Sequence, residues 1–259
     1  MHTVDVSLDQ KIEELFSYRR FSELYDIAGV KQEERLDFHQ KLKNLQTAIY
    51  HLDAHLEENW FLDEAVLNAR WLKIYQTLAP FGINESRAEG YCGHIKRYEK
   101  HEKQLRKGIM PQKYSMEYFY FYKSCDVKLM RRLIFESFPS LKKLFSLSEW
   151  RWFDLITEVN DDVTDVFEDL AFINGNSFLI SLAKSNKAKT HRTFSEFIDY
   201  IETKNNLVDR SRSEWSQTIF EMTKQNISLT RVLLNENLNT FTNEDLKKSA
   251  LFIQFNNSQ

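Results

Sequence analysis

The acidic residues between 154 and 169 have the types and spacing that could bind divalent cations. If this segment is a helix, they share one face: Asp154, Glu158, Asp161, Asp165, Glu168 and Asp169. Like charges four residues apart destabilise a helix by about 0.2–0.5 kcal/mol per pair, and a bound cation would remove that cost. The alternative is an amphipathic helix whose acidic face lies in water, where ions screen the repulsion.

A second acidic pair lies upstream in a long amphipathic segment. Asp53 and Glu57 are one helical turn apart, so their carboxylates project to the same side and could share a hard cation through oxygen ligands. Two such helices that face each other across a bundle would form a metal site. His51 and His55 could instead bind zinc or iron, but no Glu-x-x-His pair completes a di-iron site.

Both acidic segments resemble motifs of the class I terpene synthases, a branch of the isoprenoid synthase superfamily. Residues 53–58, DAHLEE, resemble the first aspartate-rich motif, DDxx(D/E)(D/E), with Ala54 in place of the second Asp. Residues 160–168, NDDVTDVFE, match the second metal motif, (N,D)Dxx(S,T)xxxE. The following segment, 175–183, is similar to the one after the metal helix in bacterial terpene cyclases. The resemblance therefore favours a cyclase.

The same stretch also resembles motifs of two other branches. Residues 161–165, DDVTD, resemble the DDxxD motif of trans-prenyltransferases, and residues 165–169, DVFED, resemble the DxxED motif of squalene and phytoene synthases. Two alternatives to a cyclase stay open: a prenyltransferase, and a non-catalytic helical scaffold that retains the fold.

The resemblance implies a reaction and a set of site residues. The enzyme would use magnesium, three ions in this family, to release diphosphate from an allylic isoprenoid diphosphate, and the carbocation would then cyclise or rearrange. The implied catalytic residues are Asp53, Lys123, Asn160 and Glu168. The implied metal ligands are Asp53, Glu57, Asn160, Thr164 and Glu168, with Asp161 and Asp165 as alternates. Lys123 would hold the diphosphate, with Arg131 and Arg132 as further candidates.

The elements that must position these residues are helices. Only 6 Gly and 3 Pro occur in 259 residues, and apolar residues recur at helical spacing between these few breakers. We expect helices over 8–27, 32–58, 60–79, 84–107, 113–137, 140–146, 149–173, 176–186, 193–224, 226–236 and 243–253. The prediction is a single-domain all-α bundle over residues 1–259, of the class I isoprenoid synthase type.

Charge and hydropathy narrow the classes of partner. The 35 basic and 38 acidic residues nearly cancel, so no overall positive field favours nucleic acid. The first residues lack the features of a signal peptide, and no window approaches 18 apolar residues. We therefore expect a cytoplasmic protein with no transmembrane segment and a small-molecule substrate. A homodimer is one assembly that the sequence allows.

Overall fold

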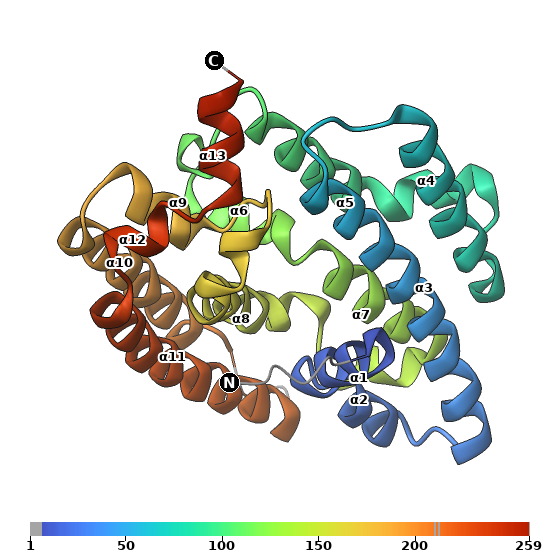
Figure 1. Cartoon of the computed structure of the whole chain (residues 1–259). Coiled ribbons are helices and arrows are strands. Elements are labelled where there is room, and N and C mark those ends of the chain that lie inside the picture. Colours follow the sequence, from blue (N-terminus) through green and yellow to red (C-terminus); the bar gives the residue numbers. More distant parts are fainter. Residues whose placement is uncertain (1–6, 210, 212, 259) are drawn as a thin grey trace. The chain divides into compact units, whose positions relative to one another are not determined.

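The computed structural model describes residues 7–209, 211 and 213–258, and the regular elements in this part of the chain are all helices, with no β-strand (Figure 1). The predicted all-α class is confirmed. The α-helices are α1 (Leu8–Tyr18), α2 (Phe21–Ala28), α3 (Gln32–Glu58), α4 (Glu64–Leu78), α5 (Glu85–Leu105), α6 (Met116–Lys123), α7 (Cys125–Ser137), α8 (Arg151–Thr164), α9 (Ser177–Lys184), α10 (Lys187–Asn206), α11 (Glu214–Thr240), α12 (Asn243–Leu246) and α13 (Ala250–Asn257).

Helix boundaries follow the sequence pattern in some places and depart from it in others. The helix predicted over 32–58 is α3, with the same bounds. The one predicted over 8–27 is divided in two, because Arg20 adopts a left-handed conformation (φ 63°) between α1 and α2. The helices predicted over 193–224 and 226–236 are wrong: α10 ends at Asn206, and α11 runs without a break from Glu214 to Thr240.

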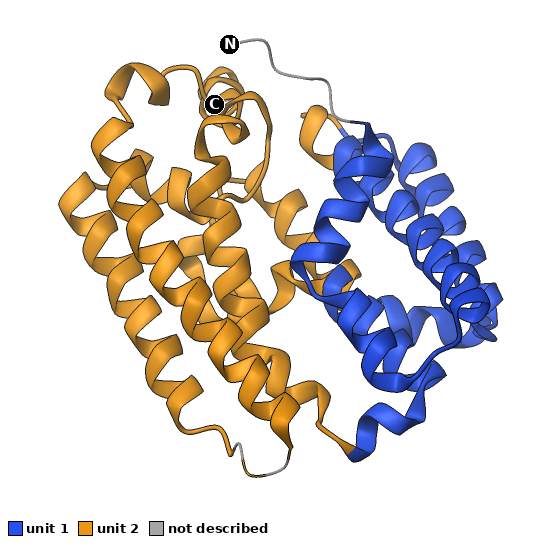
Figure 2. Cartoon of the chain, turned by 90° about the horizontal axis from the view of Figure 1, so that it is seen from below, with its two compact units in different colours: residues 1–55, 62–93, 126–143 blue, residues 56–61, 94–125, 144–259 orange. Residues whose placement is uncertain are grey.

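The chain forms two compact units, each assembled from several separate segments of the sequence (Figure 2). Unit 1 comprises residues 1–55, 62–93 and 126–143, and unit 2 comprises residues 56–61, 94–125 and 144–259. The single domain expected over 1–259 stays a prediction. None of the described helices is long and apolar enough to cross a membrane.

Unit 1 is held together by aromatic side chains from α1, α2, α3 and the end of α7. The ring of Phe38 packs edge-on against Phe138 at 4.9 Å between centroids and against Tyr25 at 6.0 Å. The ring of Phe16 lies 5.1 Å from that of Phe21. Such aromatic pairs contribute about 0.5–1.5 kcal/mol each beyond the area that they bury.

Unit 2 is organised around α8, which packs against α6, α9, α10 and α11. Its apolar stripe is fully buried in the core of this unit and includes Leu155, Ile156, Val159 and Val163. Burying an aliphatic side chain of this size contributes about 1.5–3 kcal/mol. This packing fixes the rotation of α8 and therefore the direction in which its acidic side chains point.

Candidate functional site

The acidic side of α8 is not simply a solvated face. Asp154, Glu158 and Asp162 are buried, with 2%, 5% and 0% exposure, whereas Asp165 and Glu168 beyond them are exposed. Taking a carboxylate out of water is costly unless charges or hydrogen bonds compensate it. The solvated-face interpretation therefore fails for the helical part of the acidic segment.

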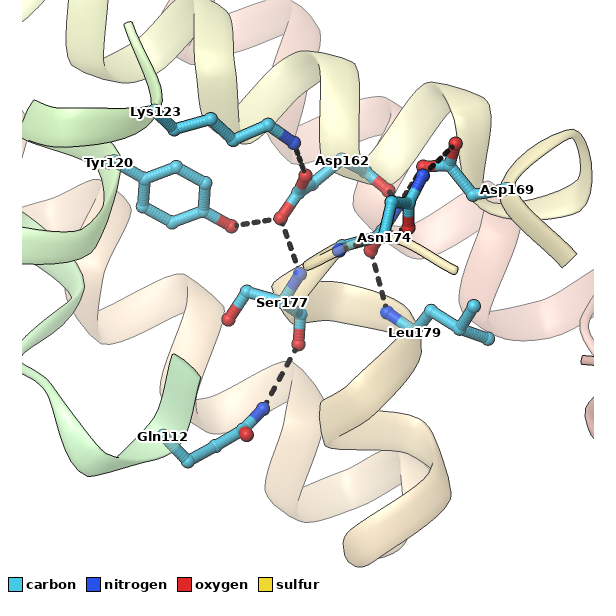
Figure 3. Close-up of polar contacts among 9 residues, drawn as sticks. Gln112, Tyr120, Lys123, Asp162, Asp169, Asn174, Ser177 and Leu179 are labelled. Atoms are coloured by element: carbon cyan, nitrogen blue, oxygen red, sulfur yellow. Dashed lines mark hydrogen bonds and ion pairs between the residues drawn. The ribbon is translucent and has the colours of Figure 1, made fainter. Parts of the chain in front are cut away.

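Asp162 is compensated by three donors, two from α6 and one from the start of α9 (Figure 3). The ammonium of Lys123, at the end of α6, pairs with Asp162 Oδ1. The hydroxyl of Tyr120 and the backbone N–H of Ser177 both donate to Asp162 Oδ2, at 2.8 and 2.7 Å. Burial by itself would lower the pKa of Lys123, but the charges of Asp162, Glu158 and Asp169 raise it above its usual value. Lys123 is therefore a firmly cationic group inside an acidic cluster.

The segment before α9 ties the two ends of the acidic sequence together. Asn176 caps α9 by accepting from the backbone N–H of Leu179 at 2.8 Å. Its amide nitrogen donates to the carbonyl oxygen of Asp162 at 2.7 Å and to the carboxylate of Asp169 at 2.6 Å. Asn174 donates to the other oxygen of Asp169 at 2.7 Å (Figure 3). These bonds hold Asp169 beside the end of α8.

Asp165 lies just past the last residue of α8 among other acids. Although Asp165 is exposed, partial desolvation by the protein atoms around its carboxyl and the negative charges of Asp161 and Asp169 raise its pKa to about 7, and Lys123 acts in the opposite direction. A raised carboxyl pKa of this origin means that like charge is only partly compensated by the protein's own cations. A cation or a proton at this position would be stabilised.

The second motif is divided between α8 and the turns that follow it. Asn160 and Thr164 lie one turn apart in α8, and the Thr164 hydroxyl donates to Asn160 Oδ1 at 3.3 Å. The α-helix then ends, and two short 3₁₀ helices follow, Asp165–Phe167 and Asp169–Ala171. Glu168 therefore lies between these turns rather than on the α-helical face predicted over 149–173. The structure brings the side chains of Asn160 and Thr164 into contact. Glu168 follows them between the two 3₁₀ helices.

The end of the first motif contacts the segment that follows the second. The backbone N–H of Ile173 donates to the carbonyl oxygen of Glu57 in the last turn of α3 at 2.8 Å. Arg106 binds the same helix end, donating to the carbonyl oxygens of Leu56, Asn59 (2.6 Å) and Trp60 (3.0 Å). Together these donors satisfy carbonyl groups that a helix leaves without intrahelical partners. Asp53, one turn before Glu57 in α3, belongs to unit 1.

The two further diphosphate candidates lie in unit 1 and have protein partners there. Arg131 has 1% exposure, donates to the carbonyl oxygen of Arg19 at 3.1 Å and lies over the ring of Phe21. Arg132 pairs with Glu136 at 2.8 Å and lies over the ring of Tyr91. Lys123, in unit 2, is the candidate with acidic site residues around it.

Sequence reasoning missed several residues of this arrangement. Asp162 pairs with Lys123 and accepts a hydrogen bond from Tyr120, and Glu102 is a buried carboxyl whose pKa burial raises to about 7. Nothing in the sequence pointed to Glu102.

Within the described residues, no three side chains of His, Cys, Asp or Glu converge closely enough to hold a metal ion by themselves. Any cation here would have to complete its coordination with other ligands, such as amide, hydroxyl, water or substrate oxygens. No protein-family model, curated protein or solved structure matches this chain.

Proposed function

We propose that this protein is a class I terpene synthase-like enzyme that ionises an allylic isoprenoid diphosphate in the presence of magnesium, releasing diphosphate. The observation that carries the proposal is the acidic end of α8, arranged around the ion pair of buried Asp162 with Lys123 and followed by a segment hydrogen-bonded to Glu57 of the first motif. Two acidic motifs and one cation are the parts that this chemistry requires.

The donor set suits a hard cation. Oxygen atoms from Asn160, Asp161, Thr164 and Asp165 occur within little more than one turn, and the raised pKa of Asp165 indicates uncompensated negative charge. Mg²⁺ commonly uses one or two carboxylates and completes its shell with water and substrate phosphates. A site without three converging acidic side chains therefore still fits magnesium bound together with diphosphate. When bound, magnesium would neutralise the charge of the leaving diphosphate.

The chain's own residues would position the diphosphate and hold the acidic segment at the end of α8 in place. Lys123 carries a positive charge that its ion pair with Asp162 holds in place, and Tyr120 in turn holds Asp162, so the ammonium can attract a phosphate oxygen without rearrangement. Asp169, fixed by Asn174 and Asn176, keeps the acidic segment at the end of α8 in place. Buried aromatic side chains of unit 2, such as Phe119 and Tyr120, supply the apolar bulk next to these groups.

The test is release of inorganic diphosphate from geranyl, farnesyl and geranylgeranyl diphosphates with magnesium. Asn160→Ala and Glu168→Ala should abolish release while leaving the folded structure intact. Asn205→Ala is the matched control for Asn160, since Asn205 is also a buried asparagine of unit 2, donating to the carbonyl oxygen of Phe220. Glu221→Ala, on the exposed side of α11, is the control for Glu168.

The same assay separates the alternatives. A cyclase gives hydrocarbon or alcohol products from the allylic diphosphate alone, whereas a chain-elongating prenyltransferase needs isopentenyl diphosphate as well. Full activity of both Asn160→Ala and Glu168→Ala would overturn the assignment of the metal motif. A folded protein that releases no diphosphate from any of the three substrates, with or without isopentenyl diphosphate, would favour the scaffold.

A further inference from the structure

The side chain of Asn160 lies in the interface between α8 and α11, with 6% exposure. Its amide nitrogen is 3.0 Å from the hydroxyl oxygen of Thr230, which is fully buried in α11. The Thr230 hydroxyl is also 2.7 Å from the carbonyl oxygen of Asn226, one turn earlier, and donates its proton there. Thr230 therefore offers Asn160 a lone pair and no proton.

This hydrogen-bond arrangement fixes which end of the Asn160 amide points where. With the Thr230 proton engaged by Asn226, the amide nitrogen of Asn160 is the end that suits Thr230. The amide oxygen must then point to the other side, where it accepts from Thr164 at 3.3 Å. A flipped amide would place two acceptor oxygens against each other at Thr230, whose proton is already donated to Asn226.

The same turn of α8 is tied to α11 a second time. Asn237, seven residues after Thr230, donates from its side-chain amide to the carbonyl oxygen of Val163 at 2.8 Å. Positions seven residues apart lie on nearly the same side of a helix, so both contacts come from one face of α11. That face therefore sets the position of the α8 turn as well as the orientation of Asn160.

We infer that Thr230 is a positioning residue for the magnesium site, holding the side-chain oxygen of Asn160 toward Thr164 so that it is available to a cation. This inference rests on the proposed function. Partners that orient metal ligands in this way are typically worth about 10–100-fold in metal affinity or activity. Thr230 has no role in the motif itself and lies 66 residues beyond Thr164 in the sequence.

The chain offers a matched control two turns earlier on the same helix. Thr223 is also fully buried in α11, and its hydroxyl donates to the carbonyl oxygen of Ile219 at 2.8 Å, one turn before it. Thr223→Val removes a buried hydroxyl of the same kind seven residues before Thr230, about 10 Å away along α11. Thr230→Val and Thr230→Ser differ in whether an oxygen is left for Asn160.

The experiment titrates magnesium at saturating inorganic pyrophosphate and follows the melting temperature of the full chain and each variant. We expect Thr230→Val to need about 10-fold more magnesium for half of the shift, whereas Thr230→Ser and Thr223→Val behave like the parent protein. If Thr230→Val does not fold, Thr230→Ala and Thr223→Ala replace the valine pair, with the same expectation.

The outcomes separate this inference from the function on which it rests. Unchanged magnesium dependence in Thr230→Val or Thr230→Ala, while the parent protein responds to magnesium with pyrophosphate, would overturn the role of Thr230 alone. Equal loss in the Thr230 and Thr223 variants would also overturn it, because a general packing defect would then explain the effect. A parent protein with no response would overturn both.

Discussion

The backbone amide of Ile173 lies 2.8 Å from the carbonyl oxygen of Glu57 and donates a hydrogen bond to it. This bond connects the last turn of α3, where the first acidic motif ends, with the segment that leaves the second motif. Ile173 also packs in a small apolar cluster with Leu105 and Leu251, which holds its backbone in place. The end of the first motif is thus attached to the rest of unit 2 through a backbone hydrogen bond.

Arg106 is predicted to be essential for this attachment. Its guanidinium donates to carbonyl oxygens of Leu56, Asn59 and Trp60, and a lysine ammonium cannot reproduce that fork of donors. Arg106→Lys should lower the free energy of unfolding by about 1–3 kcal/mol in urea, because buried carbonyl groups lose their partners. It should also weaken the response to magnesium with pyrophosphate. Lys103→Arg, an exchange at a residue paired with Glu99 at 2.8 Å, should leave both quantities unchanged.

The ion pair between Lys123 and the buried Asp162 gives a prediction about charge. Lys123→Met leaves the Asp162 carboxylate buried without its cation, which should cost roughly 3–5 kcal/mol of unfolding free energy. Adding Asp162→Asn removes the stranded charge and keeps an acceptor for Tyr120 and Ser177, so the double variant should be more stable than Lys123→Met. Urea unfolding of both proteins measures this. A double variant less stable than the single one would contradict the account.

The sequence predicted the local features and missed the long-range ones. The bounds of α3 and the pairing of Asn160 with Thr164 follow from helical spacing, which is visible in the sequence. The break at Arg20 was missed because a left-handed residue there is usually Gly or Asn, not Arg. The end of α8 at Thr164 was missed because neither Gly nor Pro marks it.

Contacts between distant helices could not be predicted in the same way. The Lys123–Asp162 pair joins residues 39 apart in the sequence, and the Asn160–Thr230 bond joins residues 70 apart. Each depends on which faces of two helices meet, and a periodic pattern specifies a helix face but not its partner. Glu158 is an example: the sequence pattern places it on the polar face of its helix, where a surface position is expected, but it is buried in the structure.

Gly175 gives a prediction about packing. A Cβ atom at this position would lie 2.7 Å from Glu102 Oε1 and 3.4 Å from the ring of Phe119. Gly175→Ala should therefore destabilise the protein by about 1–3 kcal/mol, the usual range for overpacking a buried site. Gly93→Ala is the control, since Gly93 is in α5 with nothing within 4 Å of an added Cβ, and it should be neutral or stabilising. Thermal melting of the two variants should give shifts of opposite sign or clearly different size.

Glu102 gives a prediction about pH. Burial raises its pKa in the folded protein from 4.5 to about 7, so the folded state binds this proton more tightly than the unfolded state. The stability that the proton provides is complete below about pH 4.5 and is lost as the pH rises toward 7. Since each pKa unit corresponds to about 1.4 kcal/mol, the full effect is of the order of 3 kcal/mol.

Glu102→Gln, which keeps the size of the side chain and removes its titration, should flatten this part of the stability profile. Urea unfolding at several pH values between 4.5 and 8 measures the slope for the parent protein and the variant. Glu99→Gln is the control, because Glu99 is on the same helix and pairs with Lys103. Equal slopes for the parent protein and Glu102→Gln would contradict the assignment of the buried proton to Glu102.

The most direct test of the central claim is thermal melting of the unmodified chain with magnesium, with pyrophosphate, and with both. A ligand that binds only the folded state stabilises it by RT ln(1+[L]/Kd), about 2.7 kcal/mol at one hundred times Kd. The proposal predicts a rise in melting temperature that needs both ligands, because the carboxylates at the end of α8 hold magnesium only together with diphosphate oxygens. A well-folded protein whose melting temperature is the same in all three conditions would contradict it.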